Sequence, residues 1–215
     1  ELDVLKWNSN KAYLTELEKK GAPGIPTMTV DKVTAEHIET AFEKFGSEKL
    51  VIKPQIGAGA WRQVLLRRGE IHPDAQALPP SAAILQPFLP SVQSEGEYSF
   101  LYFGGEFSHA LLKTAVKGDY RIQSAYGGKA IGYTPKPHER ETVQRILGCL
   151  DFEPLYARVD LLRGVDGELK LIELEMIEPY LYLPFAEGEG AENQGALMLA
   201  RALKRRIAGR PRHLS

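Results

Sequence analysis

The sequence has few cysteines and no long apolar run, and each absence excludes a class of protein. It has one cysteine, Cys149, in 215 residues, so it cannot form an internal disulfide and is not a disulfide-stabilised scaffold. A single thiol also fits a reducing compartment, and we expect a cytoplasmic protein. The longest apolar run covers only Ala196–Ala200, whereas a membrane-spanning helix needs about 20 such residues, so no membrane partner is expected.

The chain also lacks an excess of charge of either sign. It carries 27 Lys and Arg against 28 Asp and Glu, for a formal net charge of −1. Domains that bind nucleic acid are usually basic, so nucleic acid is not an expected partner. No internal repeat is present, and 43% hydrophobic residues is ordinary for a globular domain. A chain of this size buries roughly 70% of its unfolded surface, enough for one core or two small lobes.

Helix and strand patterns occur in blocks along the chain. A helix is expected at 9–20, with Ser9 as N-cap and Gly21 as the stop signal. Further helices are expected at 34–45, 137–150 and 193–208, strands at 50–54, 62–67, 82–86, 98–103, 106–112, 155–162 and 168–175, and irregular segments at 69–80 and 117–129. Helices at the front, middle and end, with antiparallel hairpins between them, predict an α+β fold.

The predicted strands at 155–162 and 168–175 alternate polar and apolar residues. Arg158 and Asp160 share one face of the first strand, and Glu173 and Glu175 share one face of the second. The short turn between the strands pairs them, so three carboxylates can converge on one polar face. Oxygen ligands on rigid strands suit Mg²⁺ rather than zinc. A solvated hairpin face with cross-strand ion pairs is the alternative.

Lys53 ends a short apolar strand and is followed by Gly57 and Gly59. A lysine at a strand end, before a glycine-bearing loop, can bring an ammonium group and backbone N–H groups to phosphate oxygens. The spacing is not that of the GxxxxGK[ST] phosphate-binding loop. An ordinary exposed strand end is therefore the alternative interpretation.

A stiff apolar segment, Leu85–Pro90, contains two prolines and leaves backbone groups unpaired. Such groups can bind the edge of a flat heterocycle while an apolar side chain covers its face. The alternative is an ordinary connection between two lobes. The five histidines show no metal-ligand spacing, and no serine or cysteine nucleophile motif is present.

These segments, in this order, resemble the ATP-grasp superfamily from about residue 8 to residue 208. The branch they are most similar to contains glutathione synthetase, D-alanine–D-alanine ligase and the ribosomal-protein glutamate ligases. The resemblance is carried by Lys11, by Lys53 in its Lys-Pro strand, by the glycine loop with Gly57 and Gly59, by the hinge residues Gln86, Pro87, Phe88 and Leu89, by Glu97, Lys113 and Arg121, by the Arg158-Val159-Asp160 strand, and by Glu173 and Glu175 before Pro179. Glu175 stands where the family usually has Asn, and Lys113 where it often has Arg.

The resemblance implies an enzyme that binds ATP and one or two Mg²⁺ ions, with Mn²⁺ as a substitute. Asp160, Glu173 and Glu175 would be the metal ligands. Lys11, Lys53, Gly57 and Gly59 would hold phosphates, Gln86, Pro87, Phe88 and Leu89 the adenine, and Glu97 the ribose. Lys113 would serve both the nucleotide and the reaction, and Arg158 and Arg121 would stabilise the transferring phosphoryl group.

The implied reaction joins a carboxylate and an amine, or a related nucleophile, through an acylphosphate. Small-molecule substrates of amino-acid or peptide type are expected, and a homodimer is compatible with the sequence. An ATP-grasp kinase that makes no amide is one alternative. The other is a nucleotide-binding module that is inactive without its N-terminal domain.

The resemblance also implies a division into lobes. We expect a central lobe at 1–88, with the Lys-Pro strand and the glycine loop, and a C-terminal lobe at 89–215, with the metal-binding strands. The family carries a further N-terminal substrate domain, which we expect to be missing from this sequence.

Overall fold

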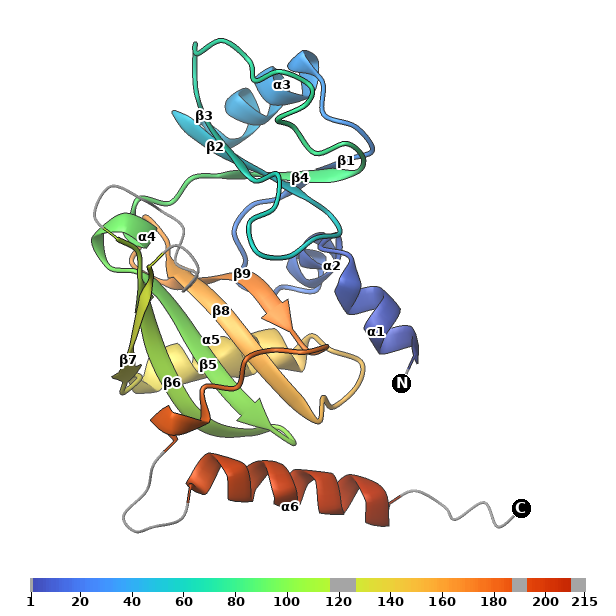
Figure 1. The fold of residues 1–215 in the computed structure, drawn as a ribbon, viewed down its shortest axis with the longest axis vertical. Coiled ribbons are helices and arrows are strands. Elements are labelled where there is room, and N and C mark those ends of the chain that lie inside the picture. The colour runs from blue at the N-terminus through green and yellow to red at the C-terminus, as the bar shows by residue number, and fades with distance from the viewer. Residues whose placement is uncertain (1, 117–126, 187–192, 210–215) are drawn as a thin grey trace.

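The computed structural model describes residues 2–116, 127–186 and 193–209, and it contains two antiparallel sheets stacked along the long axis (Figure 1). The first sheet has the order β1-β4-β2-β3. Its strands are β1 (Met28–Val30), β2 (Lys49–Pro54), β3 (Val64–Arg67) and β4 (Ala83–Pro87), and helix α3 (Ala35–Phe45) covers one face. Thr34 caps α3 by accepting a hydrogen bond from the His37 N–H, and Gly46 ends it in the left-handed conformation.

The second sheet has the order β7-β6-β5-β8-β9. Its strands are β5 (Glu97–Phe103), β6 (Glu106–Thr114), β7 (Lys129–Tyr133), β8 (Tyr156–Arg163) and β9 (Leu169–Glu175). Helix α5 (Pro137–Gly148) packs its buried Val143 and Ile146 into the same core as Phe100 and Val159. The α+β fold predicted from the sequence is confirmed. Among the described residues, no helix is long and apolar enough to cross a membrane.

The N-terminal segment differs from the prediction. The helix expected at 9–20 begins only at Tyr13, as α2 (Tyr13–Lys19). A second helix precedes it, α1 (Leu2–Ser9), which the sequence did not predict, and Ser9 ends this helix instead of capping α2. The break has a local cause, because the Asn10 side chain accepts a hydrogen bond from the backbone N–H of Ala12 at 2.9 Å. A polar side chain that bonds to its own backbone in this way competes with helical hydrogen bonding.

Both N-terminal helices attach to the second sheet at its edge strand, β9. The Asn8 amide donates to the Leu174 carbonyl at 2.7 Å and its oxygen accepts from the Met176 N–H at 2.9 Å. The Tyr13 hydroxyl also bonds to both backbone groups of Leu174. The division at residue 88 stays a prediction, but helices from the 1–88 range pack on the sheet of the 89–215 range.

Two more predictions need correction. The strand expected at 62–67 begins only at Val64, because Arg62 has a φ of +51° and belongs to the preceding turn. The loop expected at 117–129 gives way to strand β7 at Lys129, and residues 117–126 of that loop lie outside the described residues. The other predicted helices and strands are present, with ends that differ by up to a few residues.

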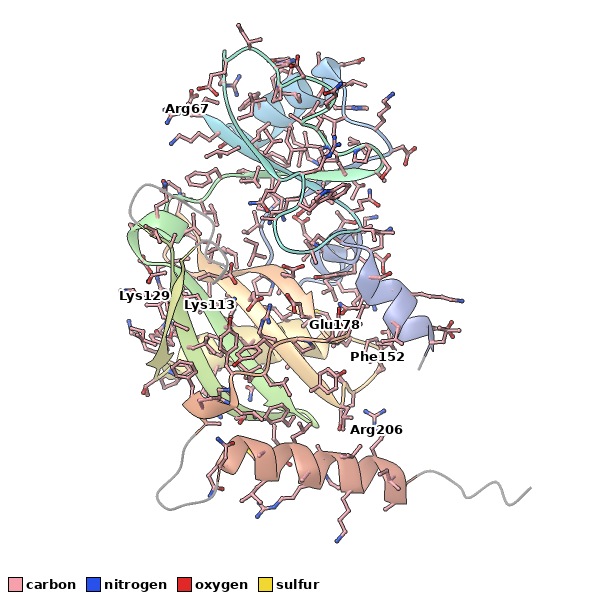
Figure 2. The ribbon with its side chains drawn as sticks, viewed as in Figure 1. Arg67, Lys113, Lys129, Phe152, Glu178 and Arg206 are labelled. Atoms are coloured by element: carbon pink, nitrogen blue, oxygen red, sulfur yellow. The ribbon has the colours of Figure 1, made fainter. Side chains whose placement is uncertain are left out.

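The remaining elements connect or cover the sheets. Helix α4 (Ser91–Ser94) leads from β4 to β5, and the 3-10 helix η2 (Leu183–Phe185) precedes α6 (Gln194–Ala208). Helix α6 is held by Arg205, which pairs with Glu106 at 2.8 Å, and by Arg206, which donates to the Glu153 carbonyl (Figure 2). A second link between the lobes is backbone pairing of Pro23 and Ile25 with Leu171 of β9.

Gly96, just before β5, provides a test of the second sheet. Its φ is +120°, and a Cβ added there would lie 2.3 Å from the Lys113 carbonyl oxygen. We expect Gly96→Ala to lower the free energy of unfolding by at least about 2 kcal/mol, because backbone strain and a backbone clash add. Urea unfolding would measure the loss. Gly21→Ala is the matched control, since Gly21 has a φ of +90° but no atom within 4 Å of the added Cβ. Equal losses in the two variants would contradict the clash.

Candidate functional site

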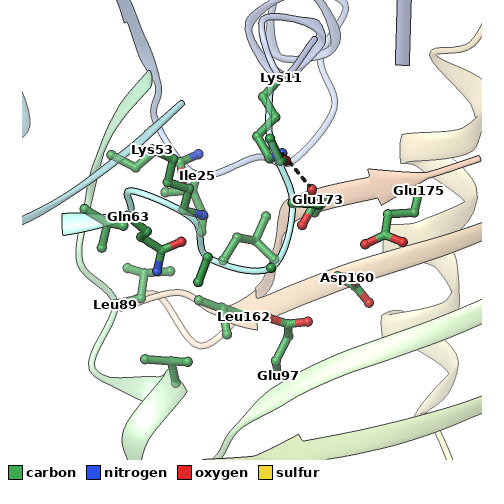
Figure 3. A pocket seen from close by; sticks show the side chains of 18 of the residues that line it. Lys11, Ile25, Lys53, Gln63, Leu89, Glu97, Asp160, Leu162, Glu173 and Glu175 are labelled. Carbon is green, nitrogen blue, oxygen red and sulfur yellow. Dashed lines mark hydrogen bonds and ion pairs between the residues drawn. The ribbon is translucent and has the colours of Figure 1, made fainter. Parts of the chain in front are cut away.

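A cavity of about 300 Å³ lies between the two sheets (Figure 3). It brings together all but one of the site residues predicted from the sequence: Lys11, Lys53, Gly57, Gly59, Gln86, Pro87, Phe88, Leu89, Glu97, Lys113, Arg158, Asp160, Glu173 and Glu175. The exception is Arg121, which lies outside the described residues.

The three predicted metal ligands meet on one face of the β8–β9 hairpin. Asp160 lies opposite Glu173, and Arg158 opposite Glu175, in the antiparallel register. One carboxylate oxygen from each of Asp160, Glu173 and Glu175 lies within 4.8 Å of the others. A set of carboxylate oxygens on two paired strands fits a hard divalent cation such as Mg²⁺. The alternation of polar and apolar residues in both strands produces this geometry.

Asp160 is the most strongly held of these carboxylates. It is almost completely buried and accepts hydrogen bonds from Ser99, from Arg158 at 2.9 Å and from Lys113 at 3.3 Å. Burial disfavours its charged form, but the Arg158 and Lys113 cations outweigh burial and lower the pKa of Asp160 to about 2. The carboxylate is therefore ionised across the physiological range.

Glu175 shows the opposite balance. Burial, together with the charges of Asp160 and Glu173, raises the pKa of Glu175 to about 7, although its ion pair with Arg158 opposes the shift. Burial is the main cause of the raised pKa, and repulsion from the two neighbouring carboxylates adds to it. A bound cation would relieve that repulsion, which is the electrostatic behaviour of a metal-binding cluster.

Two lysines, Lys11 and Lys53, line the cavity beside the acidic cluster. Lys11 lies between α1 and α2, and its ammonium group donates to the Gly57 carbonyl at 2.6 Å and pairs with Glu173 at 3.2 Å. The Lys53 side chain makes no hydrogen bond or ion pair with any described residue. Burial lowers the pKa of Lys53, and the charges of Glu173 and Glu97 oppose the shift. An unpaired, partly buried cation next to a glycine loop is suited to an anionic ligand such as a phosphate.

The other end of the cavity is apolar. Ile25, Val51, Phe88, Val92 and Leu162 form one small cluster of buried side chains between the sheets, and all five line the cavity. A narrow apolar slot beside the hinge is the surface that a flat aromatic ring needs. Sequence reasoning missed Ile25, Val92 and Leu162, because they come from separate elements and have only the signal of ordinary core residues.

Tyr182 also lines the cavity. Its φ of +48° is rare for a residue with a Cβ. The conformation is held by neighbours: the His109 ring bonds to the Leu181 carbonyl at 3.0 Å, and the Phe185 N–H donates to Tyr182. Tyr180 is 67% exposed, so it is not a core residue.

The ion pairs of Lys113 provide a second test. The Lys113 side chain lies on the second sheet (Figure 2), 2.6 Å from Glu97 and 3.3 Å from Asp160, and it is 7% exposed. We expect Lys113→Met to lower the free energy of unfolding by about 3–5 kcal/mol, because two buried carboxylates lose a partner. Lys170→Met is the control, since its exposed pair with Asp166 contributes at most about 1 kcal/mol. Urea unfolding measures both free energies of unfolding. Similar losses in the two variants would contradict the special role of the buried pairs.

No family model matches the chain. The chain is 30% identical to the cycloserine biosynthesis protein DcsG of Streptomyces lavendulae, in an alignment that covers 96% of this chain and 72% of that protein. The crystal structure of the D-cycloserine synthetase DcsG superposes with a TM-score of 0.83 at 27% identity, covering 96% of this chain and 73% of the other.

Two more distant structures share the fold. The D-alanine–D-alanine ligase of Bacillus anthracis is 14% identical with a TM-score of 0.64, covering 94% of this chain and 69% of its own. The ATP-grasp ligase PsnB, complexed with a minimal precursor, is 17% identical with a TM-score of 0.61, covering 91% and 61%. Together with the identity to DcsG over nearly the whole chain, these relatives show that the protein belongs to the ATP-grasp superfamily and is an ATP-dependent ligase that forms C–N bonds.

Proposed function

We propose that the protein is a Mg²⁺-dependent carboxylate–amine ligase that acts through an acylphosphate on an amino-acid-like small molecule. One observation carries the proposal: the acidic cluster on β8 and β9 and two lysines, Lys11 and Lys53, line the same cavity, which ends in an apolar slot. A nucleoside triphosphate has the matching order of parts, with a flat ring at one end and a metal-binding polyanion at the other.

The acidic cluster fits Mg²⁺ by its chemistry, as carboxylate oxygens within 4.8 Å of one another. Asp160, Glu173 and Glu175 would hold the cation, and Mn²⁺ is expected to substitute. When bound, the cation neutralises charge on the phosphates. We propose one or two ions, since Glu173 and Glu175 can each offer a second oxygen.

The chain's own cations have distinct tasks in this proposal. Lys53, with no partner among the described residues, binds phosphate oxygens directly. Lys11 leaves Glu173 when nucleotide binds and moves to a phosphate, because the carboxylate is then engaged elsewhere. Arg158, between Asp160 and Glu175, stabilises negative charge on the transferring phosphoryl group. Arg121 is proposed to assist, from outside the described residues.

Two substitutions make up the reaction. A carboxylate oxygen of the donor attacks the γ-phosphorus, and the bond from the γ-phosphorus to the β–γ bridging oxygen breaks. This step forms the acylphosphate and releases ADP as the leaving group. The amine nitrogen of the acceptor then attacks the acyl carbon, the bond to the phosphate oxygen breaks, and inorganic phosphate leaves while the nitrogen loses a proton. Neither step needs a protein nucleophile, so the residues act by positioning and by stabilising charge.

The substrate class rests on the metal end of the cavity and on the relatives. Tyr182 lines the cavity beyond Glu175, and an Arg158 N–H lies 3.5 Å from the Tyr180 carbonyl. This end can take a small polar molecule beside an aromatic ring. Two of the relatives are named for cycloserine and for D-alanine, both of amino-acid type. We therefore propose an amino acid or a close derivative as donor and acceptor.

A thermal-shift titration tests the nucleotide site. ATP with Mg²⁺ at 100 times its dissociation constant should stabilise the fold by about 2.7 kcal/mol, which raises the melting temperature by several degrees. Lys53→Met and Glu173→Gln should each abolish most of the shift, since one removes a phosphate-binding cation and the other a metal ligand. Lys44→Met, on the exposed side of α3, is the control and should keep the full shift. A shift that does not depend on Mg²⁺ would contradict the metal assignment.

Trapping with hydroxylamine tests the acylphosphate. The protein, ATP and Mg²⁺ are mixed with hydroxylamine and each D- and L-amino acid in turn, and hydroxamate and inorganic phosphate are measured. One or a few amino acids should give equal amounts of both products. A stable phosphorylated product without hydroxamate would favour the kinase alternative.

A further inference from the structure

Gln86 stands at the hinge with a side chain that is almost completely enclosed. It is the fourth residue of β4, is 2% exposed, and lines the nucleotide cavity. A buried amide has two N–H donors and one carbonyl oxygen, and each group needs a partner. Which of its ends faces the cavity therefore decides what chemistry the cavity offers to a ring.

The orientation of the Gln86 amide is fixed by Thr27. In the β1–β4 register Met28 lies opposite Leu85, so Thr27 comes beside Gln86. The Thr27 hydroxyl is 2.8 Å from the Ile25 carbonyl, which can only accept, so the hydroxyl hydrogen is committed there. The hydroxyl oxygen is then an acceptor, 2.9 Å from the Gln86 amide nitrogen. The amide nitrogen points to Thr27, and the amide oxygen points away from it.

That oxygen is an acceptor without a partner in the protein. No described residue donates a hydrogen bond to the Gln86 Oε1. The Tyr102 hydroxyl is the one described buried side-chain atom that lacks a partner and is sealed from solvent, so Gln86 Oε1 is not sealed. The cavity that Gln86 lines is the open space it reaches. Ile25, which anchors Thr27, lines the same cavity (Figure 3).

We propose that Thr27 is a positioning residue: by fixing the Gln86 amide with its oxygen toward the cavity, it sets the preference of the site for purines with an amino group at C6 over purines with a carbonyl at C6. The inference rests on the assignment of the cavity to ATP. The C6 amino group of adenine donates a hydrogen bond, which the Gln86 oxygen can accept. The C6 carbonyl of guanine or hypoxanthine only accepts, so two oxygens would face each other.

Reversing the amide to suit guanine is opposed by the same contacts. The Gln86 oxygen would then face the Thr27 hydroxyl oxygen. Thr27 could donate to it only by releasing the Ile25 carbonyl, which is buried. Either way one buried polar group is left unpaired, and such a loss lowers affinity by about tenfold or more.

The test compares triphosphates that differ at C6. Dissociation constants of ATP, GTP and inosine triphosphate are measured by calorimetry with Mg²⁺, for the wild type and for Thr27→Val, Thr27→Ser and Gln86→Leu. The wild type should bind ATP at least tenfold more tightly than the other two. Thr27→Val keeps the side-chain shape but removes the hydroxyl, so the preference for ATP, measured as the ratio of the GTP to the ATP dissociation constant, should fall about tenfold. Thr27→Ser should keep the wild-type preference, and Gln86→Leu should abolish it.

Inorganic triphosphate is the matched ligand control, and its affinity should be unchanged in Thr27→Val because it has no base. Equal binding of ATP and inosine triphosphate by the wild type would overturn the proposal without any variant. An unchanged ratio in a folded Thr27→Val would also overturn it, while Mg²⁺-dependent ATP binding would leave the proposed function intact. If the wild type does not bind ATP at all, both this proposal and the proposed function are contradicted.

Discussion

The balance of charge around Asp160 is the constraint on which the rest of the site depends. Its carboxylate is buried, and it stays ionised because Arg158 and Lys113 lie against it. Each cation also forms an ion pair with a second carboxylate, Arg158 with Glu175 and Lys113 with Glu97. Desolvating one charge is unfavourable, but an alternating set of opposite charges compensates it locally. The polar face of the central strands can therefore be buried next to a hydrophobic core without neutralising the group that a cation needs.

The two sheets contribute different parts of the cavity, and neither sheet forms the whole cavity by itself. The second sheet supplies acids on rigid paired strands, where register fixes the distance between ligands. The first sheet and the loop after it supply Lys53 and the glycines. Lys11 connects this loop to the acidic cluster, since its ammonium group touches both the Gly57 carbonyl and Glu173. The position of the lysines relative to the acidic cluster thus depends on how the two sheets are arranged. The distances among the three carboxylates depend only on the β8–β9 hairpin.

This difference explains how much could be read from the sequence. The placement of Asp160, Glu173 and Glu175 follows from alternation within two adjacent strands, so local pattern was sufficient. The separation of α1 and α2 depends on the Asn10 side chain, and the attachment of Tyr13 depends on a strand about 160 residues away. No periodicity reports such contacts. The hinge showed the same limit, because the chain order indicates Gln86 but only the tertiary register brings Thr27 beside it.

The attachment of the N-terminal helices to β9 has a consequence for association between molecules. An edge strand normally presents unpaired backbone groups to any passing chain. Here Asn8 and Tyr13 bind the outer N–H and carbonyl groups around Leu174, and the Pro23–Ile25 segment pairs with Leu171. Side chains and a short piece of backbone thus take the place of a sixth strand. Removing this cover would expose the backbone of the strand that carries two of the proposed metal ligands, so the same segment also blocks pairing of β9 with a strand of another molecule.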